Sequence, residues 1–165
     1  MPLNLPDGDT CFIDANIFYY HFVETPPFSD ACTDLLERVA AGQITAFAST
    51  HVLAEAMHKI MLAEAAARFR LQRTSLVNWL QSNRPRINEL SEFREVVGEL
   101  AALPIINLPI QLADFPLAAD IATDMSLLTN DAISVALMRR NGLVHLVTND
   151  NDFDRIHGLT VWKPR

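Results

Sequence analysis

The chain has 165 residues, of which 20 are acidic and 13 are Lys or Arg, so its formal net charge is −7. This length suits one domain with a proper core and is short for two, and the acidic balance argues against a protein that holds nucleic acid through overall charge, although it leaves local binding open. Charges and prolines interrupt every apolar run before the ~18 residues of a membrane span, and the amino terminus lacks a secretion signal, so we expect a cytoplasmic protein without a membrane anchor.

Five short apolar runs are typical of buried parallel strands, because polar, Gly or Pro residues bound each of them. They lie at residues 11–13, 44–48, 105–108, 144–147 and 159–162. Segments with helical spacing lie between them, at residues 29–41, 52–69 and 130–141. Gly42 and Gly142 are expected helix stops, and Ser49 with Thr50 is a helix-cap signal. The alternation predicts an α/β protein with a parallel sheet and right-handed crossovers.

Residues 61–103 carry no strand signal, and segments 74–82 and 88–102 look like separate helices divided by Pro85. Linker composition and repeats are lacking, so we expect a helical elaboration at about 61–103 within a single domain, 1–165. Part of it, residues 67–86, holds five arginines and neither Asp nor Glu; they are Arg68, Arg70, Arg73, Arg84 and Arg86. Such a basic stretch is more often a solvated helix face than a nucleic-acid site.

Four acidic residues lie where predicted strands end or predicted helices begin. Asp14 and Asp150 follow the first and fourth strands, while Glu55 and Asp131 lie near the starts of two helices. If the first strand is central, the first and fourth strands are neighbours, and their carboxyl ends flank the point where the chain changes direction. Helices that run antiparallel to the strands begin at the same edge. We therefore expect the four carboxylates to converge.

Converging carboxylates repel one another, and in isolation some would take up protons. A hard divalent cation, Mg²⁺ or Mn²⁺, resolves this repulsion and prefers oxygen ligands. Such a cation can polarise a phosphodiester and lower the pKa of a bound water for in-line attack. Asn16, Thr129 and Thr148 stand beside the acids and are candidates for orienting a ligand carboxylate or a water.

Each acid also has an ordinary structural explanation. Asp14 or Asp131 can cap a helix, Asp150 can make an Asx turn, and Glu55 can lie on an exposed helix face. Asn16 argues against a haloacid-dehalogenase-like phosphatase, which has a second Asp at that place. A response-regulator receiver would need an Asp after the third strand, and none is present. The set of four acids therefore favours the metal site.

Four segments together resemble the motifs of PIN-domain nucleases. They are Phe12-Ile13-Asp14-Ala15-Asn16, the spacing from Ser49-Thr50 to Glu55, Leu128-Thr129-Asn130-Asp131-Ala132, and residues 147–153. The resemblance implies a three-layer fold with a central parallel sheet ordered 3-2-1-4-5, flanked by helices, and Mg²⁺- or Mn²⁺-dependent cleavage of RNA. It gives catalytic and metal-binding roles to Asp14, Glu55, Asp131 and Asp150, and Asp152 is close enough to Asp150 to take the role of the fourth acid.

Many proteins of this family are VapC-type toxins that an antitoxin holds inactive, and they commonly dimerise through helices. The resemblance therefore implies an RNA substrate, an antitoxin partner if the chain is such a toxin, and a homodimer. Residues 29–41 and 52–69 also carry more apolar side chains than one sheet face obviously needs. The alternative is a catalytically silent PIN-like protein that binds RNA or acts as a scaffold, against which the intact acids argue.

Overall fold

The computed structural model describes residues 1–165, except the side chain of Arg73. Five parallel strands form one sheet in the order β3-β2-β1-β4-β5. The strands are β1 (Thr10–Ile13), β2 (Thr45–Ser49), β3 (Ile106–Leu108), β4 (His145–Val147) and β5 (Thr160–Trp162). Phe12 pairs with Phe47 of β2 on one side and with Leu146 of β4 on the other, so β1 is central. The predicted parallel sheet and its strand order are confirmed.

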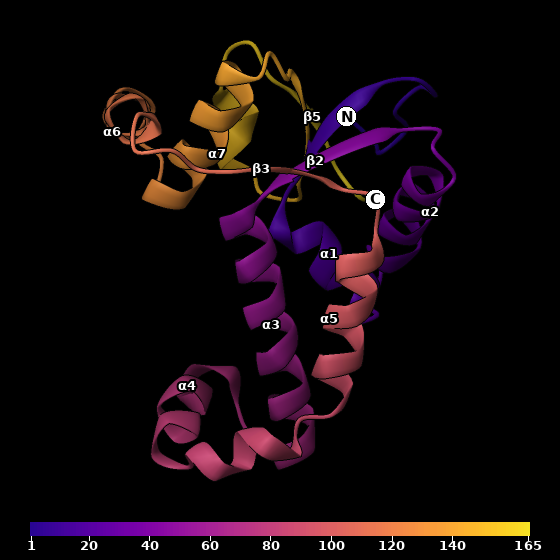
Figure 1. Cartoon of the computed structure of the whole chain (residues 1–165), viewed down its shortest axis with the longest axis vertical. Helices are drawn as coiled ribbons and strands as arrows, with labels where there is room; N and C mark the ends of the chain where they lie inside the picture. The colour runs from indigo at the N-terminus through magenta and orange to yellow at the C-terminus, as the bar shows by residue number, and fades with distance from the viewer.

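Helices cover both faces of this sheet. They are α1 (Ala15–Phe22), α2 (Ser29–Ala40), α3 (Thr50–Phe69), α4 (Arg73–Ser82), α5 (Glu92–Ala102), α6 (Asp114–Met125) and α7 (Thr129–Arg140), with two 3₁₀ helices, η1 (Arg84–Glu89) and η2 (Asp152–Arg155). Right-handed crossovers put α1, α2, α3 and α5 on one face and α6 and α7 on the other. In Figure 1, α2 and α7 accordingly lie on opposite sides of the sheet. The predicted α/β layers are confirmed, although the sequence pattern predicted neither α1 nor α6.

The core follows from the apolar strands. Cys11, Phe12 and Ile13 of β1 are completely buried, as a strand covered on both faces must be. Cys11 and Cys32 are free, and burial raises the pKa of each thiol to about 12, so neither is a reactive thiolate.

Among the described residues, no helix is long and apolar enough to cross a membrane.

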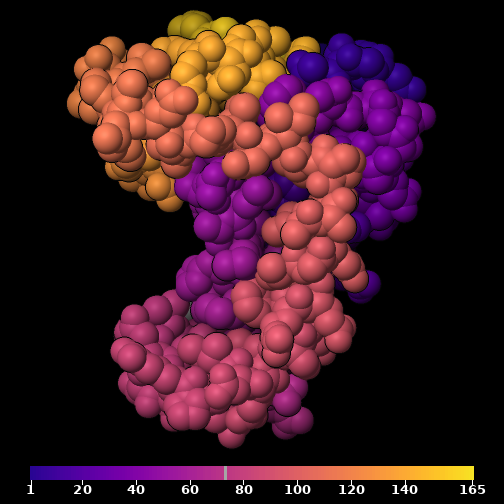
Figure 2. Space-filling model, viewed as in Figure 1, coloured from indigo at the N-terminus to yellow at the C-terminus, as the bar shows by residue number. Residues whose placement is uncertain are grey.

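The middle of the chain forms an arm that extends from the sheet. In Figure 1, α3 and α5 run side by side away from the strands and α4 lies at the far end. Figure 2 shows the end of the arm as a lower body that a narrower waist joins to the rest of the molecule. A small second core holds it together, with Ala65, Leu76, Leu80 and Leu90 buried at its centre and partly buried side chains such as Phe69 and Trp79 packed around them. We propose that the arm belongs to one domain with the sheet, because α3 runs unbroken from the main core into this second one.

The local signals explain where several helices begin and end. Ser49 is the N-cap of α3, where its side chain accepts a hydrogen bond from the Val52 amide. Gly42 and Gly142 follow α2 and α7 with φ of 73° and 64°, the left-handed conformation that favours glycine at a helix end. The helix predicted at 88–102 instead begins at Glu92, because residues before it form the 3₁₀ helix η1.

Candidate functional site

Asp14 lies at the carboxyl end of the central strand, where β1 passes directly into α1. Its Oδ1 accepts a hydrogen bond of 2.7 Å from the Ala15 amide, which makes Asp14 the N-cap of α1. Its Oδ2 accepts hydrogen bonds of 2.6 Å from both Thr148 Oγ1 and Asn16 Nδ2. The carboxylate is therefore held in one orientation by two residues at the start of α1 and by Thr148, which directly follows β4.

Thr148 and Asn16 join the ends of these two strands. The buried Thr148 hydroxyl accepts hydrogen bonds from Asn16 Nδ2 at 2.9 Å and from the Asp150 amide at 3.0 Å. Asn16 Oδ1 in turn accepts from the Asn149 amide at 3.1 Å. Both residues thus contact Asp14 directly. Thr129 differs: it is the exposed first residue of α7, and no hydrogen bond joins it to an acid within the described part of the chain.

Three further carboxylates meet beside this network. Asp131 lies in the first turn of α7, Asp150 follows β4, and Asp152 begins η2. One oxygen from each lies within 4.8 Å of the others, a spacing that allows a shared cation. Asp150 Oδ1 also accepts a hydrogen bond of 2.8 Å from the Asp152 amide, so the Asx turn considered for Asp150 is formed as well.

Glu55 lies on α3 with its side chain 35% exposed, and its Oε1 is 2.7 Å from the ammonium of Lys59 one turn later. Glu55 therefore lies on a partly exposed helix face, which is the structural explanation that its sequence position also allows. Its charge nevertheless acts on the acidic site, because it raises the pKa of both Asp14 and Asp131. Glu55 is therefore within electrostatic range of these two carboxylates.

The electrostatics show the repulsion expected of clustered acids. Burial, followed by the charges of Asp150, Asp14, Glu55 and Asp152, raises the pKa of Asp131 to about 6. Burial also raises the pKa of Asp14, against the opposing hydrogen bonds from Thr148 and the Ala15 amide. A cation among these groups would favour their ionised forms. The donors are carboxylate oxygens without thiolate or imidazole, which fits Mg²⁺ or Mn²⁺ better than a softer metal.

The sequence profile of the family described as PIN domain matches residues 11–159. The chain belongs to the PIN domain family. Its matched region begins in β1 and ends just before β5, so it includes all five acids. No curated protein matches the sequence.

Solved structures share the PIN fold along nearly the whole chain. VapBC2 from Rickettsia felis, bound to a DNA fragment from the promoter, has a TM-score of 0.60 at 16% identity and covers 93% of this chain and 98% of that one. A toxin-antitoxin complex from Klebsiella pneumoniae has 0.55 at 18%, covering 94% and 98%. VapC20 from Mycobacterium tuberculosis, described as a toxin that cleaves the sarcin-ricin loop, has 0.58 at 14%, covering 87% and 92%. At these identities the likeness is one of fold.

His51 connects the two helices that carry Glu55 and Asp131 in this PIN domain. Its Nδ1 lies 2.8 Å from Ser49 Oγ, and its Nε2 lies 3.3 Å from Ser134 Oγ on α7. Burial lowers its pKa and so favours the neutral imidazole. These contacts with Ser49 and Ser134 give His51 a structural role between the two helices.

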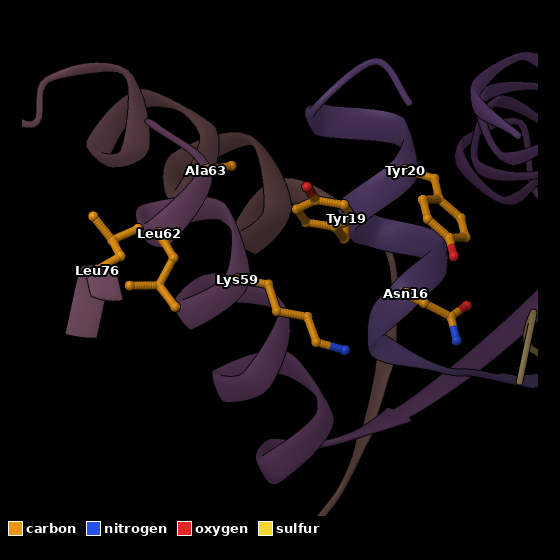
Figure 3. Close-up of a pocket in the computed structure, with 7 residues that line it drawn as sticks. All are labelled: Asn16, Tyr19, Tyr20, Lys59, Leu62, Ala63 and Leu76. Atoms are coloured by element: carbon orange, nitrogen blue, oxygen red, sulfur yellow. The ribbon is translucent and has the colours of Figure 1, made fainter. Parts of the chain in front are cut away.

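A cavity that the sequence did not indicate opens between α1 and α3, beside the acids (Figure 3). Asn16 and Lys59 form its polar part, and both contact acidic residues of the site. Spacing in the sequence gives one signal for Lys59, since Glu55 and Lys59 are four residues apart on a helix. The other lining residues come from α1, α3 and α4, and no local sequence pattern predicts how these helices pack against one another.

Proposed function

We propose that this PIN-domain protein is a Mg²⁺- or Mn²⁺-dependent endoribonuclease. The observation that carries the proposal is the meeting of Asp131, Asp150 and Asp152 within 4.8 Å beside Asp14, at the carboxyl edge of the sheet. This is where open α/β sheets place their ligands. In the proposed assignment, the catalytic and metal-binding acids are Asp14, Glu55, Asp131 and Asp150, with Asp152 as a further ligand or as the substitute for Asp150.

When bound, the cation would supply positive charge to the phosphodiester and lower the pKa of a water to generate the nucleophile. The residues of the chain prepare the place for it. Thr148, Asn16 and the Ala15 amide fix the Asp14 carboxylate before any ligand arrives, which reduces the reorganisation that binding would require. Glu55 is half-exposed, and among the described side chains its ion-pair partner is the flexible Lys59, so it can reorient toward a ligand.

The family and its solved relatives support RNA as the substrate. The solved structures that share this fold include toxin-antitoxin complexes and a toxin described as cleaving the sarcin-ricin loop. By this analogy we propose that the chain is the toxin of a toxin-antitoxin pair, with a protein antitoxin as its partner and cytoplasmic RNA as its target. The alternative is a catalytically silent PIN protein that binds RNA or acts as a scaffold.

Cleavage of labelled RNA by the purified protein distinguishes the two functions. We expect cleavage with millimolar Mn²⁺ or Mg²⁺ and none with EDTA, and we expect calorimetry to detect Mn²⁺ binding in the absence of RNA. The silent alternative predicts equal RNA binding with Mn²⁺ and with EDTA, and intact RNA in both. Intact RNA at every metal concentration would contradict the proposed nuclease.

A further inference from the structure

The cavity between α1 and α3 has a volume of about 360 Å³, which lies within the roughly 300–1,000 Å³ of small-ligand pockets. Leu76 of α4 contributes to its lining, so the arm contributes to the same space. Figure 3 shows the Lys59 side chain extending from α3 toward α1, with Leu62 and Leu76 facing each other farther along the helix. The cavity is therefore polar near the acids and apolar away from them.

The polar part of the cavity is continuous with the acidic site. Lys59 Nζ is 2.7 Å from Glu55 Oε1, and Asn16 Nδ2 donates to Asp14 Oδ2 at 2.6 Å. Lys59 also lowers the pKa of Asp14, so its charge reaches the second acid. A polyanion that approaches five carboxylates needs a compensating cation, and Lys59 is placed to supply one.

The remaining walls suit a flat, largely apolar group. Leu62, Ala63 and Leu76 are aliphatic, and two tyrosines of α1 add aromatic surface. One of these, Tyr20, is held by its packing on Phe28, with ring centroids 4.8 Å apart, and by a hydrogen bond of 3.1 Å from Asn149 Nδ2 to its hydroxyl. Aromatic and aliphatic walls of this kind hold unstacked bases in proteins that bind single-stranded RNA.

We propose that this cavity is the subsite for one unpaired ribonucleotide next to the cleaved bond, with its base between the helices and its phosphate on Lys59. The inference rests on the proposed ribonuclease function and adds to it a binding position for one nucleotide. A base that is stacked and paired in a duplex cannot enter a cavity between two helices. The nucleotide that occupies this cavity is therefore unstacked and unpaired.

The test is a methyl NMR titration of the whole protein with adenosine and uridine 5′-monophosphate at millimolar concentrations, in Ca²⁺. We expect saturable shifts of the Leu62 and Leu76 methyl resonances. Ala63→Phe fills the cavity and should abolish these shifts, whereas Ala67→Phe, at an exposed position one turn farther along α3, should retain them. Lys59→Met should weaken nucleotide affinity about tenfold, and Lys59→Arg should restore most of it because the charge is kept.

Activity and metal binding separate this inference from the proposed function. Ala63→Phe should bind Mn²⁺ as the wild type does, which also shows that it folds, and should cleave single-stranded RNA at least tenfold more slowly. Saturable shifts that only the cavity variant loses support the subsite whether or not RNA is cut. Absent shifts in the wild type overturn the subsite even if Mn²⁺-dependent cleavage proceeds.

Discussion

One buried hydroxyl, that of Thr148, connects three polar groups at the acidic edge. It donates to Asp14 Oδ2 and accepts from Asn16 Nδ2 and from the Asp150 amide. A hydroxyl has one proton and two lone pairs, so this arrangement uses its full hydrogen-bonding capacity. Removing it would leave buried polar groups without a partner, which costs more than the loss of the hydrogen bond itself.

Thr148→Val should therefore lower both stability and activity. We expect the free energy of unfolding to fall by about 1–3 kcal/mol, the cost of leaving a buried polar group unsatisfied, and RNA cleavage to slow because Asp14 loses its orientation. Urea unfolding and cleavage rates measure the two effects. Thr148→Ser keeps the hydroxyl and serves as the matched control. Equal stability of the valine and serine variants would show that the hydroxyl does not organise the site.

The Asp131 carboxyl gives the metal-free protein a defined dependence on pH. Its pKa rises from 3.8 to about 6 in the folded chain, so the folded state binds this proton more tightly than the unfolded state. The resulting stabilisation is complete below pH 3.8 and is lost as the pH rises through about 6. Asp131→Asn removes the titrating group and the repulsion, so in EDTA it should melt at a higher temperature than the wild type above pH ~6.

Added Mn²⁺ should reverse the order of the two melting temperatures. Metal binds the ionised carboxylates, so it should stabilise the wild type more than Asp131→Asn at neutral pH, and this gain should shrink as the pH falls below ~6. Differential scanning calorimetry with EDTA and with Mn²⁺ measures both curves. If millimolar Mn²⁺ leaves the melting temperature of the wild type unchanged at neutral pH, the acids do not form a metal site.

The sequence predicts the positions of the acids better than it predicts the residues around them. Asp14 and Asp150 follow apolar strands, and parallel strands bring such residues to one edge whatever the details of packing. Leu76 and Tyr20 reach the cavity only because α1, α3 and α4 pack at particular angles, which no local pattern records. Thr129 is close to Asp131 in sequence, but nearness along a helix does not fix where a side chain points.

The sequence pattern did not predict α1 and α6, and each omission has a physical reason. α1 has only eight residues, and its aromatic side chains give little contrast between a buried and an exposed face. α6 contains Pro116, which looks like an interruption in the sequence, yet it occupies the first turn, where a missing amide proton costs nothing. The start of α5 depends on a distant residue: Glu64 of α3 accepts hydrogen bonds from the amides of Ser91, Glu92 and Phe93.

Four of the arginines of residues 67–86 belong to described parts of the arm, which lies away from the sheet (Figure 2); they are Arg68, Arg70, Arg84 and Arg86. Arg68 and Arg86 lie 3.9 and 3.1 Å from Glu89, and Arg86 also covers the Phe69 ring at 4.8 Å from its centroid. Phe69 and Trp79 pack together at 4.9 Å, as expected for core residues. The Arg73 side chain lies outside the described residues. These contacts favour a solvated, internally paired face over an RNA-binding one.

Changing Arg68, Arg70 and Arg73 together to Ala should accordingly leave RNA affinity and its salt dependence unchanged. Binding is measured across a salt series, with Ca²⁺ in place of Mn²⁺ to slow cleavage. Lys59→Met, at the acidic edge, is the comparison variant that should weaken binding. Reduced affinity of the triple variant with a shallower salt slope would instead assign phosphate contacts to the arm.

Apolar side chains that stay exposed on a single chain are candidates for an interface between subunits. The apolar side chains of α2 that suggested an interface, Cys32, Leu35, Leu36 and Val39, are buried within the subunit. Exposed apolar residues gather instead around the start of α6, where Leu112, Phe115 and Leu117 are 86%, 46% and 39% exposed. We propose a homodimer, as in the sequence interpretation, with this surface in its interface.

Light scattering during gel filtration should give the mass of two chains. Phe115→Glu should give the mass of one, because a charge at an apolar interface is costly to bury. Val77→Glu, an exposed apolar position on α4, is the control that should remain dimeric. A wild-type protein of single-chain mass at micromolar concentration would contradict the proposed dimer.

Metal-dependent RNA cleavage by Asp14→Asn tests the central claim most directly. The change removes one ligand charge with almost no change in shape, and an amide can keep the hydrogen bond to the Ala15 amide that caps α1. With the fold checked by circular dichroism, we predict that Asp14→Asn loses Mn²⁺-dependent cleavage, while Asp34→Asn, the same change at an exposed position of α2, cleaves at the wild-type rate. Equal cleavage by Asp14→Asn and the wild type would contradict the assignment of the acidic edge as a nuclease site.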